Sequence, residues 1–320
     1  MNQTESTIGY FGKLPNFADF VSFNSANDEI NNFDQWLQKG LMIAKSRLVN
    51  KFDENYLAMP SYRFLFPSVN NSYSLIGTLY PGRDLSGRKF PFITYSRFIN
   101  SNFYAGSFKF LPLLSRDLFL ASDNFFNEAK NESASFELSE TLNSIYFPSL
   151  SNNNECMDDY QNYLNETSIN QFWIDSFPDG KDKYAVIKYL LELLTPLRNN
   201  YSSNFLPGVK LPFQYGLGSD THNICVWIEI IAALIKDNSM KPFLFWTTAN
   251  IDSYAYLYLY LNKPMPENFV SFIVHDNIVD SLCDLTALNK IEYNSDLPAD
   301  YKSLLDEYQI TIREFIERLD

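Results

Sequence analysis

The chain has 320 residues, 46% of them hydrophobic and 17% aromatic, which is enough to bury the core of one large domain or of two ordinary ones. Its formal net charge of −13 at pH 7 excludes a general nucleic-acid binder, because such a protein needs a basic surface to displace counterions from phosphates. The acidity is regional, since residues 111–180 carry a net charge of −10 and residues 241–320 one of −7, whereas residues 1–110 carry +3.

The cysteine content and the hydropathy predict a cytoplasmic protein. The three cysteines, Cys156, Cys225 and Cys283, are odd in number and widely spaced, which indicates reduced thiols rather than disulfides or a metal site. Residues 1–7 have neither the basic nor the apolar region of a secretory signal. The longest apolar stretch, residues 224–235, is shorter than the roughly 20 residues that cross a bilayer, so we expect no direct membrane insertion.

The first hundred residues predict one helix followed by three strands. Apolar residues at three- and four-residue spacing predict an amphipathic helix over 32–49, with Asn31 or Asn32 as its N-cap. Aromatic and β-branched residues predict three strands, at residues 62–66, 73–80 and 90–98. Because Pro81 and Gly82 supply a turn, we expect the second and third strands to form an antiparallel hairpin.

Helical patterns dominate the rest of the chain. They cover residues 184–194, 224–235 and 301–319, the last as a C-terminal amphipathic helix. We expect Pro196 to stop the first of these helices, and Asp220 or Thr221 to cap the second. Residues 243–248 predict a strand. Tyrosines alternate in the segment that follows: Tyr254, Tyr256, Tyr258 and Tyr260. They are either core residues or a patch that faces a partner.

Early strands with helices around them predict an α/β fold with a mixed or largely antiparallel sheet. We divide the chain into an N-terminal α/β portion, residues 1–130, an acidic and polar insertion or linker, residues 131–180, and a C-terminal portion, residues 181–320, that completes the fold. Within the insertion, residues 149–167 are rich in Ser, Asn, Asp and Glu. Such a composition buries little apolar area to offset the entropy of ordering, so we expect this stretch to be exposed.

Four motifs follow one another in the first hundred residues. They are Gly9-Tyr-Phe-Gly-Lys-Leu-Pro-Asn-Phe-Ala-Asp-Phe-Val21, Trp36-Leu-Gln-Lys-Gly-Leu41, Tyr62-Arg-Phe64 and Tyr80-Pro-Gly-Arg-Asp-Leu-Ser-Gly-Arg-Lys-Phe-Pro-Phe92. In this order they resemble the TagF/ImpM family, accessory proteins of the bacterial type VI secretion system. Two downstream segments, 242–248 and 263–269, resemble the family more loosely. The chain departs from the family pattern at Ala18, where Gly is usual, at Gly82, where Ser is common, and at Phe245, which replaces a Trp.

The resemblance implies a fold and a function. The fold is a three-layer α/β/α sandwich. The function is post-translational regulation in a Gram-negative bacterium, in which a non-catalytic protein without cofactors holds the type VI secretion apparatus inactive. It implies binding to cytoplasmic components such as an FHA-domain scaffold, and it does not specify an oligomeric state.

The charged residues of the first and last motifs are the candidate partner-binding site: Lys13, Asp19, Arg83, Asp84 and Arg88. In one interpretation Arg88 pairs with Asp19 or Asp84 inside the protein and fixes the two loops to one another. In the other, the arginines grip a carboxylate or phosphate of a partner bidentately. Both interpretations can hold at once.

Two other classes of function stay open. An enzyme such as a hydrolase could use Asp220 with His222 or His275 with Asp276, and the same groups could ligate a metal, but no known catalytic or metal-binding motif surrounds either pair. Residues 82–89 space their glycines like a P-loop but lack its Lys-Ser/Thr pair and lead into a strand, so we expect no nucleotide there. The remaining class is a structural subunit of the secretion machine.

Overall fold

The computed structural model describes residues 7–68, 72–103, 106–132, 135–146, 154–177, 180, 182–198, 207–216, 220–249, 251, 254–276, 279–288 and 297–319. The strands are β1 (Thr7–Gly12), β2 (Val21–Phe23), β3 (Tyr62–Pro67), β4 (Tyr73–Tyr80), β5 (Phe92–Ile99), β6 (Gly208–Phe213), β7 (Phe243–Thr247), β8 (Ala255–Tyr260) and β9 (Leu282–Asp284). The helices are α1 (Asp28–Leu48), α2 (Phe52–Ala58), α3 (Leu111–Leu114), α4 (Arg116–Ala129), α5 (Ser135–Ser144), α6 (Asn154–Glu166), α7 (Ile169–Ser176), α8 (Lys183–Arg198), α9 (Asp220–Ile235), α10 (Phe269–Ile273), α11 (Ala299–Asp306) and α12 (Ile312–Leu319).

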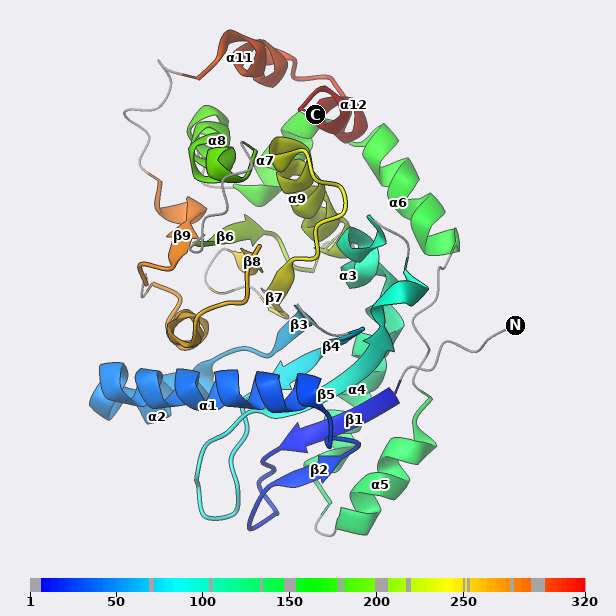
Figure 1. Ribbon diagram of the computed structural model, residues 1–320, viewed down its shortest axis with the longest axis vertical. Coiled ribbons are helices and arrows are strands. Elements are labelled where there is room, and N and C mark those ends of the chain that lie inside the picture. Colours follow the sequence, from blue (N-terminus) through cyan, green and yellow to red (C-terminus); the bar gives the residue numbers. More distant parts are fainter. Residues whose placement is uncertain are drawn as a thin grey trace.

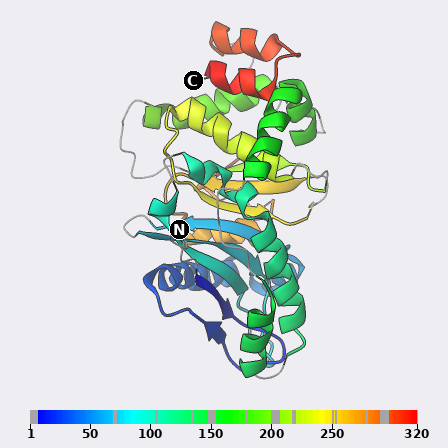
Figure 2. The same cartoon turned by 90° about the vertical axis from the view of Figure 1, so that its right-hand side faces the viewer.

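All these strands belong to one sheet, with the order β2-β1-β5-β4-β3-β7-β8-β6-β9. Neighbouring strands are antiparallel except β6 and β9, which are parallel. Helices cover both faces of the sheet (Figure 1), and Figure 2 shows α11 and α12 at the end of the molecule far from β1 and β2. The predicted α/β layers with a mixed, largely antiparallel sheet are therefore confirmed, as is the hairpin of β4 and β5.

The two halves of the chain meet where β3 pairs with β7. Phe64 of the third motif lies opposite Phe245 of the downstream segment, and both side chains are fully buried. This pairing places residues about 180 positions apart in the sequence on adjacent strands. The sheet is continuous across the halves, and the division at residues 130 and 180 stays a prediction.

Helix α1 packs on one face of this junction. Trp36 stacks on Phe245 with 5.2 Å between ring centroids and meets Phe269 edge-on at 5.9 Å. Gly40 lies so close to α10 that an added Cβ would be 2.6 Å from the Cβ of Phe269 and 2.9 Å from the carbonyl oxygen of Pro266. The second motif thus docks on the downstream 263–269 segment, and its Trp and Gly are explained by packing.

Helix α9 occupies the other face and is buried almost all round, which explains why its sequence is apolar on every side. Its single acidic residue after the first turn, Glu229, accepts hydrogen bonds from Lys109 Nζ at 2.8 Å and from the Tyr160 hydroxyl at 2.7 Å. The carboxylate is thereby neutralised and links α9 to α6. The indole N–H of Trp227 donates to the carbonyl oxygen of Pro212 in β6.

The Arg of the third motif crosses to a different helix. Arg63 points away from α1 and contacts Asp123 of α4 through both terminal nitrogens, one of them at 2.8 Å, and it also donates to Thr78 at 2.6 Å. The Tyr80 hydroxyl donates to the same carboxylate at 2.8 Å. Because Arg63 is only 8% exposed, this bidentate pair fixes α4 on the sheet.

Several predicted boundaries differ from the structure. Helix α1 begins one turn early, because Asn27 and not Asn31 or Asn32 accepts the capping hydrogen bond, from the Ile30 N–H. Helix α8 continues past Pro196, which falls in its last turn and removes a single helical hydrogen bond. The amphipathic C-terminus is helical in two pieces, since Thr311 and Glu314 form a capping box that starts α12.

Residues 154–166 of the stretch expected to be exposed form α6, and the expectation is wrong for Tyr160 and Leu164, whereas Glu155, Asp158, Asp159 and other polar residues of the helix are exposed. Tyr160 and Leu164 of this helix are buried in the main core, with Tyr160 completely inaccessible. The Tyr163 hydroxyl donates to Asn223 of α9 at 2.6 Å. Two or three large side chains at helical spacing were enough to anchor the segment, which an average over its composition concealed. Residues 149–153 lie outside the described part of the chain.

Within the described ranges, no helix is both long enough and apolar enough to cross a membrane.

The close approach of Gly40 to α10 makes a stability prediction. Gly40→Ala should raise helix propensity by about 1 kcal/mol, but the added methyl group overpacks the contact with Phe269 and Pro266. We expect a net loss of about 1–2 kcal/mol in the free energy of unfolding, measured by urea denaturation. Ser46→Ala, at an exposed position of the same helix, is the control and should not be destabilising. A Gly40→Ala protein as stable as the parent would contradict this packing.

Candidate functional site

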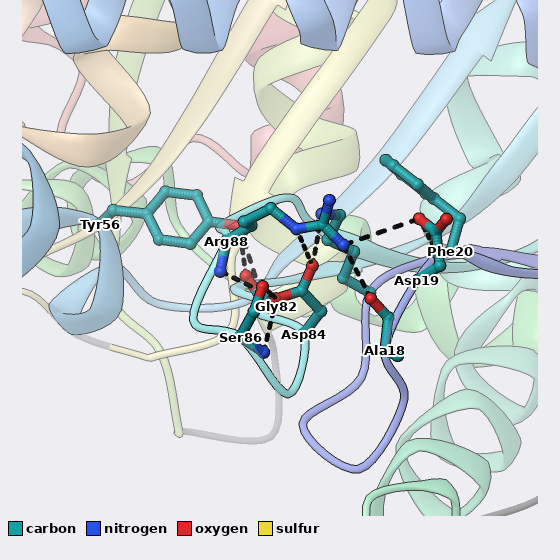
Figure 3. Close-up of polar contacts among 9 residues, drawn as sticks. Ala18, Asp19, Phe20, Tyr56, Gly82, Asp84, Ser86 and Arg88 are labelled. Carbon is teal, nitrogen blue, oxygen red and sulfur yellow. Dashed lines mark hydrogen bonds and ion pairs between the residues drawn. The ribbon is translucent and has the colours of Figure 1, made fainter.

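The first and last of the four motifs form two loops that lie against each other (Figure 3). Residues 13–20 connect β1 to β2, and residues 81–91 connect β4 to β5. The Leu85 N–H donates to the carbonyl oxygen of Phe17 at 2.8 Å, and Arg88 Nη2 donates to that of Ala18 at 2.7 Å. We call residues 13–20 and 81–91 together the motif loops.

The carboxylate of Asp84 organises the motif loops. One oxygen accepts from Lys13 Nζ and from Arg88 Nε, both at 2.7 Å. The other accepts from the Ser86 N–H and hydroxyl and from the Arg88 N–H, at 2.7–3.0 Å. Asp84 is 2% exposed and Lys13 is 5% exposed, so this is a buried ion pair with its hydrogen-bonding capacity filled.

These contacts control the ionisation of Asp84. Burial alone would raise the pKa of its carboxyl group, but hydrogen bonds from Lys13, Ser86 and Arg88 outweigh burial and hold the pKa well below its usual range. The ionised form therefore stabilises the folded state. This contribution is complete above the unfolded-state pKa of about 4 and is lost as the pH falls through that value toward the lower folded-state pKa.

Two glycines shape the hairpin loop. An added Cβ at Gly82 would lie 2.4 Å from the carbonyl oxygen of Phe90 and 2.6 Å from that of Lys13, so no side chain fits at this crossing of the loops. The Tyr56 hydroxyl contacts both the N–H and the carbonyl oxygen of Gly82 at 3.1 Å. Gly87 adopts φ +84°, which the turn requires. Ala18, in contrast, has no positive φ, so the departure from Gly there causes no strain.

Other side chains of the motif loops are exposed to solvent around the buried contacts of Asp84 and Gly82. Asp19 has 80% of its side chain exposed, Leu85 is 69% exposed, the Arg88 side chain is 59% exposed and Phe20 is 42% exposed. Arg83 is also exposed and has no hydrogen-bond or ion-pair partner for its side chain among the described residues. The motif loops thus present charged and apolar groups side by side to solvent.

The hairpin separates its two arginines. Arg83 lies opposite Lys89, so these side chains share one face of the hairpin, and Lys89 Nζ lies 2.8 Å from Asp53 Oδ1 of α2. Arg88 lies with Asp84 on the other face, toward residues 13–20. A single ligand group therefore cannot be held by both guanidinium groups in one fork.

The structure brings four of the five predicted site residues together. The predicted internal pairing of Arg88 with Asp84 is present at 2.7 Å, whereas Arg88 and Asp19 lie 4.0 Å apart at the surface. Lys13 and Asp84 are buried, so neither offers its charge to a partner directly. Sequence reasoning did not single out Tyr56 or Leu85, although a large apolar residue in a polar loop was a signal for Leu85.

The two histidines lie on opposite faces of the sheet. His222 of α9 is stacked on Tyr163 of α6, and its Nε2 lies 3.2 Å from Asp159, not from Asp220. Burial lowers the pKa of His222, against the opposing effect of the Asp159 carboxylate.

His275 Nδ1 lies 3.0 Å from the Tyr258 hydroxyl, on the side of α1 and α10. Burial, together with the charge of Lys210, lowers the pKa of His275 to about 4. Its neighbour in sequence, Asp276, is exposed. His275 and Asp276 share no hydrogen bond or ion pair among the described residues, and the charge of Asp220 affects His222 less than that of Asp159 does. In the described part of the chain no three His, Cys, Asp or Glu residues gather as a metal site would require.

Comparison with protein families assigns the N-terminal part of the chain. Residues 9–145 match the TagF N-terminal domain, a type VI secretion system-associated domain. These residues are a TagF N-terminal domain. The TagF/ImpM family prediction is thereby confirmed over that range, and the protein is associated with type VI secretion.

The fold extends beyond the TagF domain. The crystal structure of PA0076 from Pseudomonas aeruginosa PAO1 is 17% identical in sequence, and the match covers 85% of this chain and 96% of that one with a TM-score of 0.51. At this identity the likeness shows a shared fold, and a match over 85% of this chain necessarily reaches beyond residue 145. No curated protein matches the chain.

The buried position of Asp84 in the TagF domain makes a second prediction. Asp84→Asn should lower the free energy of unfolding at pH 7 by roughly 3–5 kcal/mol, because Lys13 is left buried without its counter-charge. Below about pH 4 the variant should lose less further stability than the parent, since the titrating group is gone. Urea denaturation from pH 7 to pH 3 measures both effects.

Asp19→Asn is the matched control. Its side chain is 80% exposed, so we expect a change of at most about 0.5 kcal/mol. Equal stability of Asp84→Asn and Asp19→Asn at pH 7 would show that the buried ion pair does not hold the motif loops.

Proposed function

We propose that this TagF-domain protein is a non-catalytic regulator that holds the type VI secretion apparatus inactive by binding its cytoplasmic components. The partner class that the family resemblance implies is an FHA-domain scaffold. The observation that supports this proposal is the construction of the motif loops. Their buried ion pair sets a rigid shape, and exposed charged and apolar side chains stand on it, as in a binding surface that is ordered before its partner arrives.

The partner-binding residues then divide into two roles. Asp19, Arg83 and Arg88 contact the partner, together with the exposed Leu85. Lys13 and Asp84 hold them in place without touching it. Arg88 serves both roles, because its Nε and Nη2 are bound within the loops while Nη1 has no partner among the described residues.

A stoichiometric binder also accounts for the histidines better than a hydrolase does. A general base must reach the proton that it removes, yet His222 is 6% exposed and its ring stacks on Tyr163 of α6. His275 contacts the Tyr258 hydroxyl through Nδ1 and has no hydrogen bond or ion pair with Asp276 among the described residues. We therefore propose that the protein is not an enzyme.

Pull-down of the tagged protein from its own host, with mass spectrometry of what co-elutes, tests the proposal. In the double variant Arg83→Glu/Leu85→Asp, recovery of type VI secretion components should fall at least about tenfold, since both side chains are exposed and unneeded for the frame. Lys241→Glu/Ile174→Asp makes the same change of net charge, with one basic and one aliphatic residue replaced by acids, at exposed positions outside the motif loops, and it should leave recovery unchanged.

Two results would overturn the proposal. One is equal recovery in both double variants, which would remove the motif loops as the binding surface. The other is loss of function in a folded His222→Gln or His275→Gln protein that still recovers every partner, which would favour an enzyme.

A further inference from the structure

The second half of α1 carries an unusual charge distribution for so acidic a protein. Between Asp34 and Asp53 there is no acidic residue, and four basic residues lie in this stretch: Lys39, Lys45, Arg47 and Lys51. Arg47 is paired with Glu267 at 3.4 Å. Lys39 and Lys45 have no carboxylate partner within the described ranges, so their charge is not neutralised by the protein itself.

The same side of α1 exposes apolar groups. Met42 is 66% exposed. Val49, which follows the last helical residue and donates its N–H to the carbonyl oxygen of Lys45, is 67% exposed. Met265, in the segment that docks against α1, is 45% exposed. The fold does not need these three side chains, because Leu41 and Ala44 supply the buried contacts of that part of α1.

A hollow of about 530 Å³ lies next to this face, between α1 and the ends of β3 and β7. Asn31, Asn32 and Gln35 of α1 line it, and so does Lys263. Asp28 and Glu29, in the first turn of α1, also line the hollow, and Glu29 is paired with Arg97 at 2.9 Å. Lys39 follows Gln35 by one helical turn, so the polar lining leads directly to the unpaired lysines.

Lys39 and Lys263 are near enough to affect each other. Partial burial lowers the pKa of Lys263, and the positive charge of Lys39 lowers it further. Lys263 also lies over the Phe66 ring at 5.9 Å and has no ion-pair partner in the described part of the chain. Two neighbouring ammonium groups without a carboxylate repel each other, and a bound oxyanion would remove this repulsion.

We propose that this face, formed by Lys39, Met42, Lys45, Val49, Lys263 and Met265, binds an acidic segment of a partner protein. Carboxylate or phosphate oxygens of the segment pair with the lysines, and an apolar side chain of the segment packs on the flexible methionines. The choice of an acidic segment follows from charge complementarity, since the rest of the chain carries a net negative charge and repels such a ligand. We call these six residues the basic face, and the inference does not depend on the motif loops.

Site-specific photocrosslinking in the host tests the basic face. A photoreactive amino acid replaces Met42 in the full-length chain, and the captured peptide is sequenced by mass spectrometry. We expect a protein segment rich in Asp and Glu or carrying phosphorylated residues, and the spectrum distinguishes carboxylates from phosphates. The matched control places the same amino acid at Ile174, a 52% exposed position of α7, which should not capture that segment.

Charge reversal identifies the lysines as the cause. Lys39→Glu/Lys263→Glu should reduce capture at Met42 at least about tenfold, while Lys236→Glu/Lys241→Glu, with the same change of net charge at exposed positions, should leave it unchanged. Both doubles are first checked for parental thermal stability. Capture of a neutral or basic segment, of lipid, of a second copy of this chain, or of nothing would overturn the inference, as would equal capture in the two doubles.

The outcome is independent of the motif-loop proposal. Arg83→Glu/Leu85→Asp leaves the basic face unaltered, so capture at Met42 can be measured in that background as well. Capture that persists while pull-down of secretion components is lost would support two separate surfaces. Failure of the Met42 capture alone leaves the motif loops as the binding surface.

Discussion

The pairing of β3 with β7 is the contact on which the rest of the molecule depends. It joins the TagF N-terminal domain, residues 9–145, to strands that the family match does not cover. The sheet therefore needs residues from both parts of the chain. The residues at the junction are aromatic on the α1 side, and Trp36 bridges Phe245 and Phe269. Without β7 this indole would lose a stacking partner and β3 would become an exposed edge, which proteins usually avoid.

Buried charges then fix the helices and loops around that sheet. Each of three elements is held by one buried or partly buried carboxylate with at least two donors: the motif loops by Asp84, α4 by Asp123 and α6 by Glu229. Replacing such a pair by apolar residues often costs little, whereas removing one partner costs several kcal/mol. These pairs therefore specify which loop or helix docks where more than they raise the overall stability.

The sequence pattern was sufficient to predict an element where the element's own residues determine its structure. Strands β3, β4 and β5 and helix α9 were predicted because their apolar periodicity is strong. Strand β6 was not, because Lys210 and Pro212 interrupt its apolar run. Lys210 is nevertheless 2% exposed, since Asp284 of the neighbouring β9 neutralises it at 2.8 Å. Such compensation comes from a distant segment, and no local pattern contains it.

The same limit applied to the candidate site. The sequence showed which residues of the motif loops carry charge, and the structure showed that these charges have different environments. In the sequence, Lys13 and Asp84 cannot be told from Arg83 and Asp19, since each pair is one basic and one acidic residue. In the structure, Lys13 and Asp84 form a buried ion pair, whereas Arg83 and Asp19 are exposed. The burial of Lys13 and Asp84 depends on how Tyr56 and residues 13–20 pack against the β4–β5 hairpin. That packing in turn depends on the arrangement of the whole sheet.

This difference decides which residues are available to a partner. A side chain whose hydrogen bonds are already satisfied inside the protein gains little by binding, because any new contact must replace an existing one. An exposed charge without an internal partner has no such cost. Arg83 in the motif loops and Lys39 and Lys263 on the basic face are of this second kind. Binding energy is therefore expected to come from the cations that the fold does not use, rather than from the ones that form its frame.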